Sequence, residues 1–188
     1  MEISRKMNLV TPVETANGNI YIHSTPITKA VYREHFLTLS KAFAAIFGQG
    51  LGVLAGPRIA YLMLERVAKN DGIWEGATGV KNTLLQEIIR NSTAIVPVEG
   101  KGWEEIPLDV AISREIVDED DVLGEIVFFT CVCAINKPKQ VTELMAEVNL
   151  LWNSACTSQT AMEWAASLPT STAKESSGAT ESTLSVPS

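Results

Sequence analysis

Four consecutive carboxylates at positions 118–121 form the densest group of side chains in this sequence that could do chemistry. Aspartates two positions apart resemble the start of a calcium-binding loop, in which carboxylates at fixed spacing hold the cation. The rest of such a loop does not follow, because Gly124 comes one position too late for its sharp turn and Phe129 stands where the closing glutamate belongs. We therefore expect the run to begin a helix, where negative charge is favourable. Its aspartates also remain candidates for a charged docking surface: Asp118, Asp120 and Asp121.

The histidines and cysteines do not form a catalytic or zinc-binding pattern. Neither His23 nor His35 has an evident serine or cysteine partner, and no G-x-S-x-G sequence occurs. On a helix, Cys131 and Cys133 would direct their thiols about 200° apart, which does not suit a shared zinc ion. These two and Cys156 lie among apolar neighbours, where cysteine behaves as a small hydrophobe. We therefore expect no catalytic residue and no metal site.

A glycine-rich segment at residues 50–55 matches the G-x-G-x-x-G/A form of the dinucleotide-binding fingerprint. That fingerprint works only where a strand enters the turn and a helix follows at once, so that backbone N–H groups face a pyrophosphate. Here a helix is predicted before the segment, and the next helix starts several residues late, at Gly56-Pro57. We interpret the segment as a turn between helices and expect no cofactor.

Charge and composition exclude further classes of protein. Residues 1–101 contain 11 basic and 8 acidic side chains, whereas residues 102–188 contain 4 and 14. This balance argues against nucleic-acid binding, which needs clustered Lys and Arg. No secretory signal follows Met1, and the most apolar segment, 126–135, is half the length of a membrane span. We expect a soluble, reduced, intracellular protein that binds no membrane.

The chain divides into three parts. Residues 1–24 read as a β-hairpin element, because two alternating segments flank Ala16-Asn17-Gly18 and Asn-Gly favours a hairpin turn. Residues 25–168 read as a helical domain, and residues 169–188 as a disordered tail too rich in Ser and Thr to bury a core. The predicted fold is mainly α with a small N-terminal β-hairpin (α+β), a single helical domain plus a disordered C-terminal tail.

Apolar spacing predicts helices along residues 25–157. The first is expected to be capped by Thr25 and to run to the glycines at 48–52, and the second to run from about Gly56 to Asn70 with Leu62 on its inner face. Further helices are expected over 81–93 and 108–116, joined by an ordered loop at 96–108 that Trp103 pins.

The segment 122–135 is apolar on nearly every face, so as a helix it would be the central buried one. Its Val, Ile, Phe and Thr content would also suit a buried strand, and periodicity does not exclude that alternative. A last amphipathic helix is predicted from Pro138, with Leu151 and Trp152 on its apolar stripe. Trp152, Leu151 and Trp164 are our candidates for apolar contacts with a partner, Trp164 because it lies close to the tail.

Several segments resemble tail assembly chaperones of long-tailed bacteriophages. They are residues 9–15 (LVTPVET) with the Asn17-Gly18 hairpin, the ending 167–172 (SLPTST) before a low-complexity tail, and the helical middle with Gly56-Pro57-Arg58 and the acidic run 118–121.

The resemblance implies a non-enzymatic chaperone that binds the tape measure protein and keeps it soluble until the tail tube polymerises. It also implies location in the host cell cytoplasm, absence from the mature virion, and a short form of a protein whose frameshifted long form recruits tail tube subunits. A structural virion protein of the tail or head–tail junction is the alternative, and an enzyme with an unrecognised acid pair is a third. Whether the chain forms a homo-oligomer stays open.

Overall fold

The computed structural model describes residues 7–15, 18–48, 50 and 52–169. Within these residues the chain forms one five-stranded antiparallel sheet with the strand order β4-β3-β2-β1-β5. The strands are β1 (Asn8–Thr15), β2 (Gly18–Ser24), β3 (Ser92–Val98), β4 (Gly102–Pro107) and β5 (Ala155–Thr157). The helices are α1 (Lys29–Glu34), α2 (Phe36–Gly48), α3 (Gly52–Asn70), α4 (Leu84–Arg90), α5 (Leu108–Ser113), α6 (Glu119–Ile135), α7 (Pro138–Trp152) and α8 (Ala161–Ser167).

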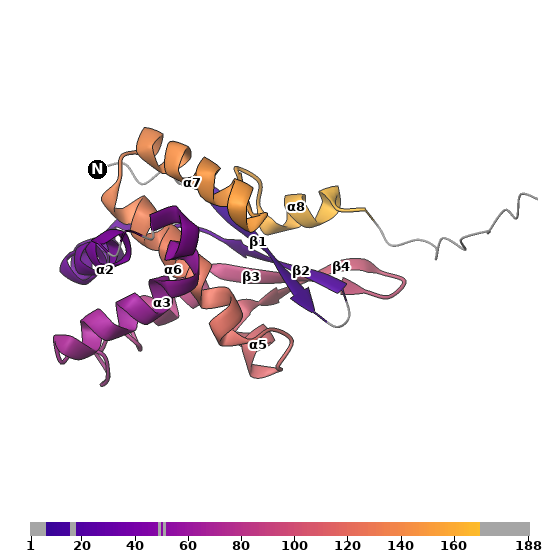
Figure 1. Ribbon diagram of the computed structural model, residues 1–188. Helices are drawn as coiled ribbons and strands as arrows, with labels where there is room; N and C mark the ends of the chain where they lie inside the picture. Colours follow the sequence, from indigo (N-terminus) through magenta and orange to yellow (C-terminus); the bar gives the residue numbers. More distant parts are fainter. Residues whose placement is uncertain (1–6, 16–17, 49, 51, 170–188) are drawn as a thin grey trace, which may run out of the picture.

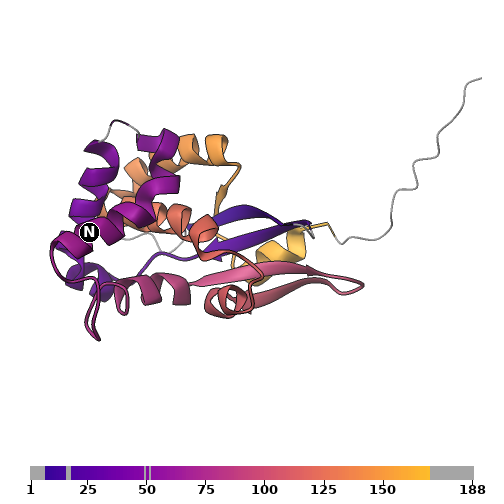
Figure 2. The same cartoon turned by 60° about the horizontal axis from the view of Figure 1, so that its bottom comes forward.

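The fold is α+β, as predicted, but its β part is larger than a hairpin. The N-terminal hairpin forms as β1 and β2, and it is the middle of the sheet rather than a separate element. The helices α2, α3, α6 and α7 gather at one end of the sheet, and the β3–β4 hairpin extends away from them (Figures 1 and 2). Ala16 and Asn17 of the predicted turn, and residues 170–188 of the predicted tail, lie outside the described residues.

The predicted loop at 96–108 is wrong, because β3 and β4 pair there as a second hairpin. Its turn uses Gly100 and Gly102, whose φ angles of 73° and 86° favour glycine. Pro97 obscured the strand in the sequence, since proline cannot donate to a sheet ladder. In the structure it lies beyond the residues of β3 that pair with β2, and opposite Trp103 of β4. The predicted helix over 81–93 is correspondingly shorter and ends before β3.

Two other helix predictions are corrected. The first helix is split into α1 and α2, and its cap is Thr28, whose hydroxyl accepts from the Val31 N–H, rather than Thr25. The helix α3 begins at Gly52, and Leu62 is 53% exposed rather than inward. The buried residues of α3 are Gly56, Pro57, Ala60, Leu64 and Ala68, and the small ones among them let α3 approach its neighbours closely.

The segment 122–135 is a helix, and it is the centre of the molecule. Every residue of α6 from Val122 to Ala134 is buried. The helix contacts α2, α3, α4 and α7 and crosses β1 of the sheet, so helices surround most of it. An all-round apolar helix requires such a position. The β alternative left open by its composition is thereby excluded.

The C-terminal part of the described chain contacts both β1 and β2. The short strand β5 pairs with residues 8–10 of β1. The carbonyl of Gln159 accepts hydrogen bonds from Asn8 Nδ2 (2.8 Å) and from His23 Nε2 (2.9 Å). His23 is therefore only 4% exposed, beneath the segment that contains Gln159. The helix α8, which the sequence did not predict, packs on β3 and β4.

None of the helices in the described part of the chain is long and apolar enough to cross a membrane.

Candidate functional site

A cavity of about 610 Å³ opens where β1, α3, α6 and α7 meet. The strand β5 covers β1 only at residues 8–10, so residues 11–14 of β1 border the opening. We call this cavity and its rim the α3–α6 groove. It is lined by Thr11, Pro12, Val13, Glu14, Pro57, Arg58, Ile59, Tyr61, Leu62, Asp120, Asp121, Gly124, Glu125 and Trp152.

A very close helix crossing forms one wall of the α3–α6 groove. A Cβ atom built on Gly124 of α6 would lie 2.5 Å from the Pro57 carbonyl oxygen of α3. One built on Gly56 would lie 2.6 Å from the ring of Phe128. Only glycine fits at such approaches, since real Cβ contacts are longer. The two glycines therefore bring the second turns of α3 and α6 together, and Arg58 lines the same cavity as Asp120 and Asp121.

Proline in α3 creates the hydrogen bond that positions Trp152. Pro57 has no N–H, so the carbonyl of Val53 four residues earlier lacks its usual helical donor. The Trp152 indole Nε1 donates to that Val53 carbonyl at 3.3 Å. This bond holds the end of α7 against the start of α3 and keeps the half-buried Trp152 ring on the wall of the groove.

Glu125 lies at the inner wall of the groove and is 6% exposed. Desolvation by burial raises the pKa of its carboxyl to about 6, although the neighbouring Ser154 and Thr11 hydroxyls favour the charged form. Its Oε1 atom is buried. The Thr11 Oγ1 atom is buried on the same wall. A hydroxyl donor thus lies beside a carboxylate acceptor, and the two groups satisfy each other away from solvent.

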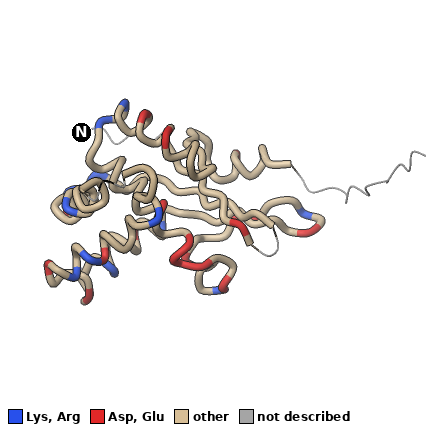
Figure 3. The backbone as a smooth tube through the Cα atoms, viewed as in Figure 1, with Lys and Arg blue, Asp and Glu red and all other residues tan. Residues whose placement is uncertain are grey.

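The rim of the groove is predominantly acidic. Glu14, Asp120 and Asp121 join Glu125, against one basic residue, Arg58. Within the described ranges, none of these four carboxylates has a basic group within 4.0 Å. Figure 3 shows the acidic start of α6 as a continuous stretch.

Tyr61 adds a phenol to the same wall. Burial, with the nearby carboxylates of Glu119, Glu65 and Asp120, raises the pKa of Tyr61 to about 12. The phenol therefore stays protonated at neutral pH and can donate a hydrogen bond.

The structure brings together three of the six residues that the sequence suggested for partner contacts. Asp120, Asp121 and Trp152 line the α3–α6 groove. Asp118 instead caps α6, accepting from the Asp120 N–H at 2.8 Å, which confirms the helix-start interpretation.

The remaining two candidates lie elsewhere. Leu151 is 54% exposed, beside Leu150 on α7, and does not line the groove. Trp164 lies on α8, half-buried, and its Nε1 is buried without a hydrogen-bond partner in the described part of the chain.

Sequence reasoning missed Glu125, although a signal was present. It is the one acidic residue within the apolar segment 122–135, and charged residues are rarely buried without a partner. Arg58 and Tyr61 carried no such signal, because their place on the groove depends on which face of α3 turns inward.

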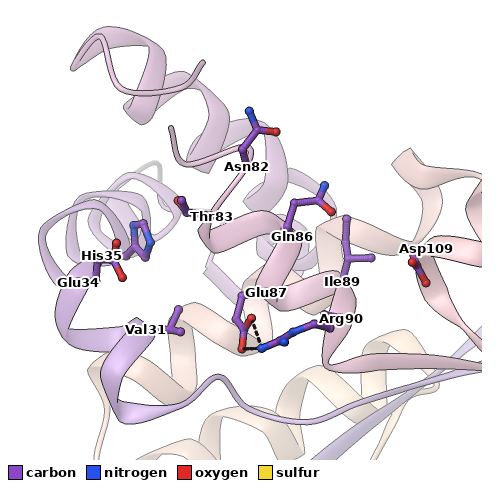
Figure 4. A pocket seen from close by; sticks show the side chains of 10 residues that line it. All are labelled: Val31, Glu34, His35, Asn82, Thr83, Gln86, Glu87, Ile89, Arg90 and Asp109. Atoms are coloured by element: carbon purple, nitrogen blue, oxygen red, sulfur yellow. Dashed lines mark hydrogen bonds and ion pairs between the residues drawn. The ribbon is translucent and has the colours of Figure 1, made fainter. Parts of the chain in front are cut away.

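A second cavity, of about 470 Å³, lies between α1, α4 and α5 (Figure 4). Its basic residue is already paired, because Arg90 Nη2 lies 2.6 Å from Glu87 Oε2. His35 on its wall is buried, and desolvation lowers its pKa despite the opposing effect of Glu34. Of the described residues that line this cavity, none is a serine or a cysteine.

The cysteines are placed as small apolar side chains. Cys131 and Cys133 are buried and Cys156 is partly buried, all as free thiols. Burial raises the pKa of Cys131 to about 12 and also raises the pKa values of Cys133 and Cys156, so the thiols are unreactive at neutral pH. Across the described residues, no three His, Cys, Asp or Glu side chains are grouped as a metal site.

No protein-family model matches the chain, and neither the curated proteins nor the solved structures contain a match to it.

Proposed function

We propose that the protein is a non-enzymatic tail assembly chaperone of a long-tailed bacteriophage, which binds the tape measure protein and keeps it soluble until the tail tube polymerises. The proposal starts from the resemblance of residues 9–15, 56–58, 118–121 and 167–172 to that family. It places the protein in the host cell cytoplasm and outside the mature virion.

The observation that carries the proposal is the α3–α6 groove. It combines apolar walls from Trp152, Ile59 and Leu62 with an acidic rim. Amphipathic helices bind in grooves by seating apolar side chains between polar edges. A tape measure protein, which is long and helical, would present such faces before the tail is built.

Exposed apolar side chains extend the surface beyond the groove. Leu54 of α3 is 68% exposed, and Leu150 and Leu151 of α7 are 86% and 54% exposed. The bond between Trp152 and Val53 joins the ends of these same two helices. Large exposed apolar side chains on two joined helices favour an interaction surface.

The direct test is co-expression with the neighbouring tape measure gene. We expect the tape measure protein to become soluble and to co-purify with this chain. Unchanged insolubility without co-purification would contradict the proposal.

Mass spectrometry of purified particles separates the two virus-related functions. A chaperone is absent from the particles, whereas a structural protein of the tail or head–tail junction is present at a fixed number of copies. The proposed long form, which recruits tail tube subunits, requires a slippery sequence in the gene that overlaps a downstream reading frame.

A further inference from the structure

We propose that the cavity between α1, α4 and α5 binds an aliphatic diamine, with one ammonium group at His35 and Glu34 and the other at Asp109. We call this cavity of about 470 Å³ the α1–α4 cavity (Figure 4). It shares no lining residue with the α3–α6 groove, so the site does not depend on the function proposed above.

The buried imidazole of His35 lacks a partner in the wall of this cavity. His35 is 8% exposed, and its ring makes no hydrogen bond with any other residue that the structure describes. Neither ring nitrogen is fully sealed from solvent, so a ligand in the cavity can reach the ring. Buried polar groups normally have a hydrogen-bond partner. A neutral imidazole has one acceptor nitrogen, which an N–H group of a ligand satisfies.

Two carboxylates without basic partners lie at separate places on the cavity. Figure 4 shows Glu34 and Asp109 at opposite ends, with Gln86 between them. Within the described ranges, neither carboxylate has a basic group within 4.0 Å. The third carboxylate, Glu87, is already paired with Arg90. The cavity therefore keeps one uncompensated negative charge at each end, which favours a ligand with two cationic groups and repels an anion.

The surface between the two ends is partly apolar. Val31 and Ile89 line the cavity, and Ile89 is 6% exposed. The methylene chain of a diamine covers such surface in the same way as the stem of a lysine side chain. A divalent metal ion has no chain and requires several oxygen ligands around one point, whereas these two carboxylates lie apart. We therefore assign the cavity to a diamine rather than to a metal ion.

Binding of small amines to the full chain tests the two-ended site directly. Isothermal titration calorimetry near neutral pH compares 1,4-diaminobutane with n-butylamine, which has one charged end, and with 1,4-butanediol, which has none. We expect the diamine to bind about tenfold or more tightly than the monoamine, because its second end adds a charged hydrogen bond, and the diol not to bind. Absence of diamine binding, or equal affinities for the diamine and the monoamine, would overturn the proposal.

Substitutions at the two exposed ends locate the ligand. Glu34→Gln and Asp109→Asn should each lower the affinity for 1,4-diaminobutane to about that for n-butylamine. Both residues are exposed, and circular dichroism confirms that the variants are folded. The matched control is Glu99→Gln, because Glu99 is exposed in the β3–β4 turn and does not line this cavity. An equal loss of affinity in Glu99→Gln would show general attraction to an acidic protein and would contradict the site.

The role of His35 is tested by pH. Burial lowers the pKa of His35 below 6.5, so the ring is neutral at pH 7, and its protonation places a positive charge beside the bound ammonium group. We expect the affinity of the wild type for 1,4-diaminobutane to fall as the pH is lowered from 6.5. His35→Gln keeps a neutral acceptor and should lose less affinity over this range.

The other charged groups that line the cavity are Glu34, Glu87, Arg90 and Asp109. They are the same in the wild type and in His35→Gln, so the difference between the two pH profiles isolates the imidazole. Parallel profiles would contradict the contact with His35.

Divalent cations provide the competing measurement. Mg²⁺ and Ca²⁺ should displace 1,4-diaminobutane less effectively than n-butylamine does. If either ion binds more tightly than the diamine and displaces it, the cavity is a metal site and the proposal is wrong.

Discussion

The indole of Trp152 donates a hydrogen bond to the carbonyl of Val53, the one acceptor in α3 whose helical donor Pro57 cannot supply. A proline in one helix thus leaves the Val53 carbonyl free to bind a tryptophan in another helix, 99 residues away from Val53 in the sequence. The pairing ties the end of α7 to the start of α3 and fixes one wall of the α3–α6 groove.

This pairing predicts a coupling between Trp152 and Pro57. Trp152→Phe keeps an aromatic ring but removes the donor, and we expect it to lower the free energy of unfolding by about 1 kcal/mol. In a Pro57→Ala background the new backbone N–H can donate to Val53, so the same substitution should cost less. Urea unfolding of the two single variants and the double variant measures this coupling. Strictly additive effects would contradict it.

The crossing of α3 and α6 predicts a severe effect of one methyl group. Gly124→Ala would place its Cβ 2.5 Å from the Pro57 carbonyl oxygen, and backbone atoms cannot move aside as a flexible side chain can. We expect a loss of about 3 kcal/mol in the free energy of unfolding. The matched control is Gly48→Ala at the end of α2, where no atom lies within 4 Å of the added Cβ. That variant should be as stable as the wild type or slightly more stable.

Because Glu125 is buried, we expect it to make the free energy of unfolding decrease as the pH rises. Burial raises its pKa to about 6 in the folded chain, against 4.5 as the ordinary value. Between these values the folded state binds more protons than the unfolded state, so the free energy of unfolding falls as the pH rises through this window. The contribution lost is about 2 kcal/mol.

Glu125→Gln tests this dependence because it cannot ionise. Urea titrations at about pH 4 and about pH 8 should show that the variant gains stability relative to the wild type at the higher pH. A constant difference between the two proteins would refute the prediction. Glu99→Gln again serves as the exposed control.

We expect His35 to have the opposite effect, so that the free energy of unfolding decreases as the pH falls. Desolvation lowers its pKa below 6.5 in the folded chain. As the pH falls from neutral through 6.5 the unfolded chain takes up the proton first, so this residue removes stability below that pH. We expect His35→Gln to retain more of its neutral-pH stability than the wild type when the pH is lowered toward the folded pKa of His35. Thermal unfolding across this range provides the measurement, and parallel curves would contradict the prediction.

The sequence predicted the elements whose patterns are local. The Asn-Gly turn with its alternating flanks predicted β1 and β2, the all-apolar segment 122–135 predicted a central helix, and α7 followed from its spacing. The strands β3 and β4 were missed, because Pro97 and the paired Glu104-Glu105 weaken the alternation that marks a strand. The strand β3 also pairs with β2, which no window of sequence around 96–108 contains.

The residues of the candidate site likewise divide into those that a local pattern suggested and those that only the tertiary structure brings together. Asp120, Asp121 and Trp152 were suggested by charge and residue type, and they do line one cavity. They line one cavity with Glu125, Thr11 and Arg58 because α3 and α6 cross closely at Gly56 and Gly124, two residues far apart in the sequence. Leu62 was predicted to face inward from apolar spacing alone. Spacing does not reveal that small residues such as Gly56, Ala60 and Ala68 lie on the inner face of α3.

The position of Gln159 has a consequence for biosynthesis. Its carbonyl holds Asn8 and His23 of the first two strands, and β5 completes the sheet edge of β1 from the far end of the chain. The hairpin of β1 and β2 therefore leaves the ribosome long before the residues that cover it are translated. Closing a loop of this length is slow relative to local pairing. During synthesis the nascent chain exposes one face of its first two strands until residues 155–159 have left the ribosome.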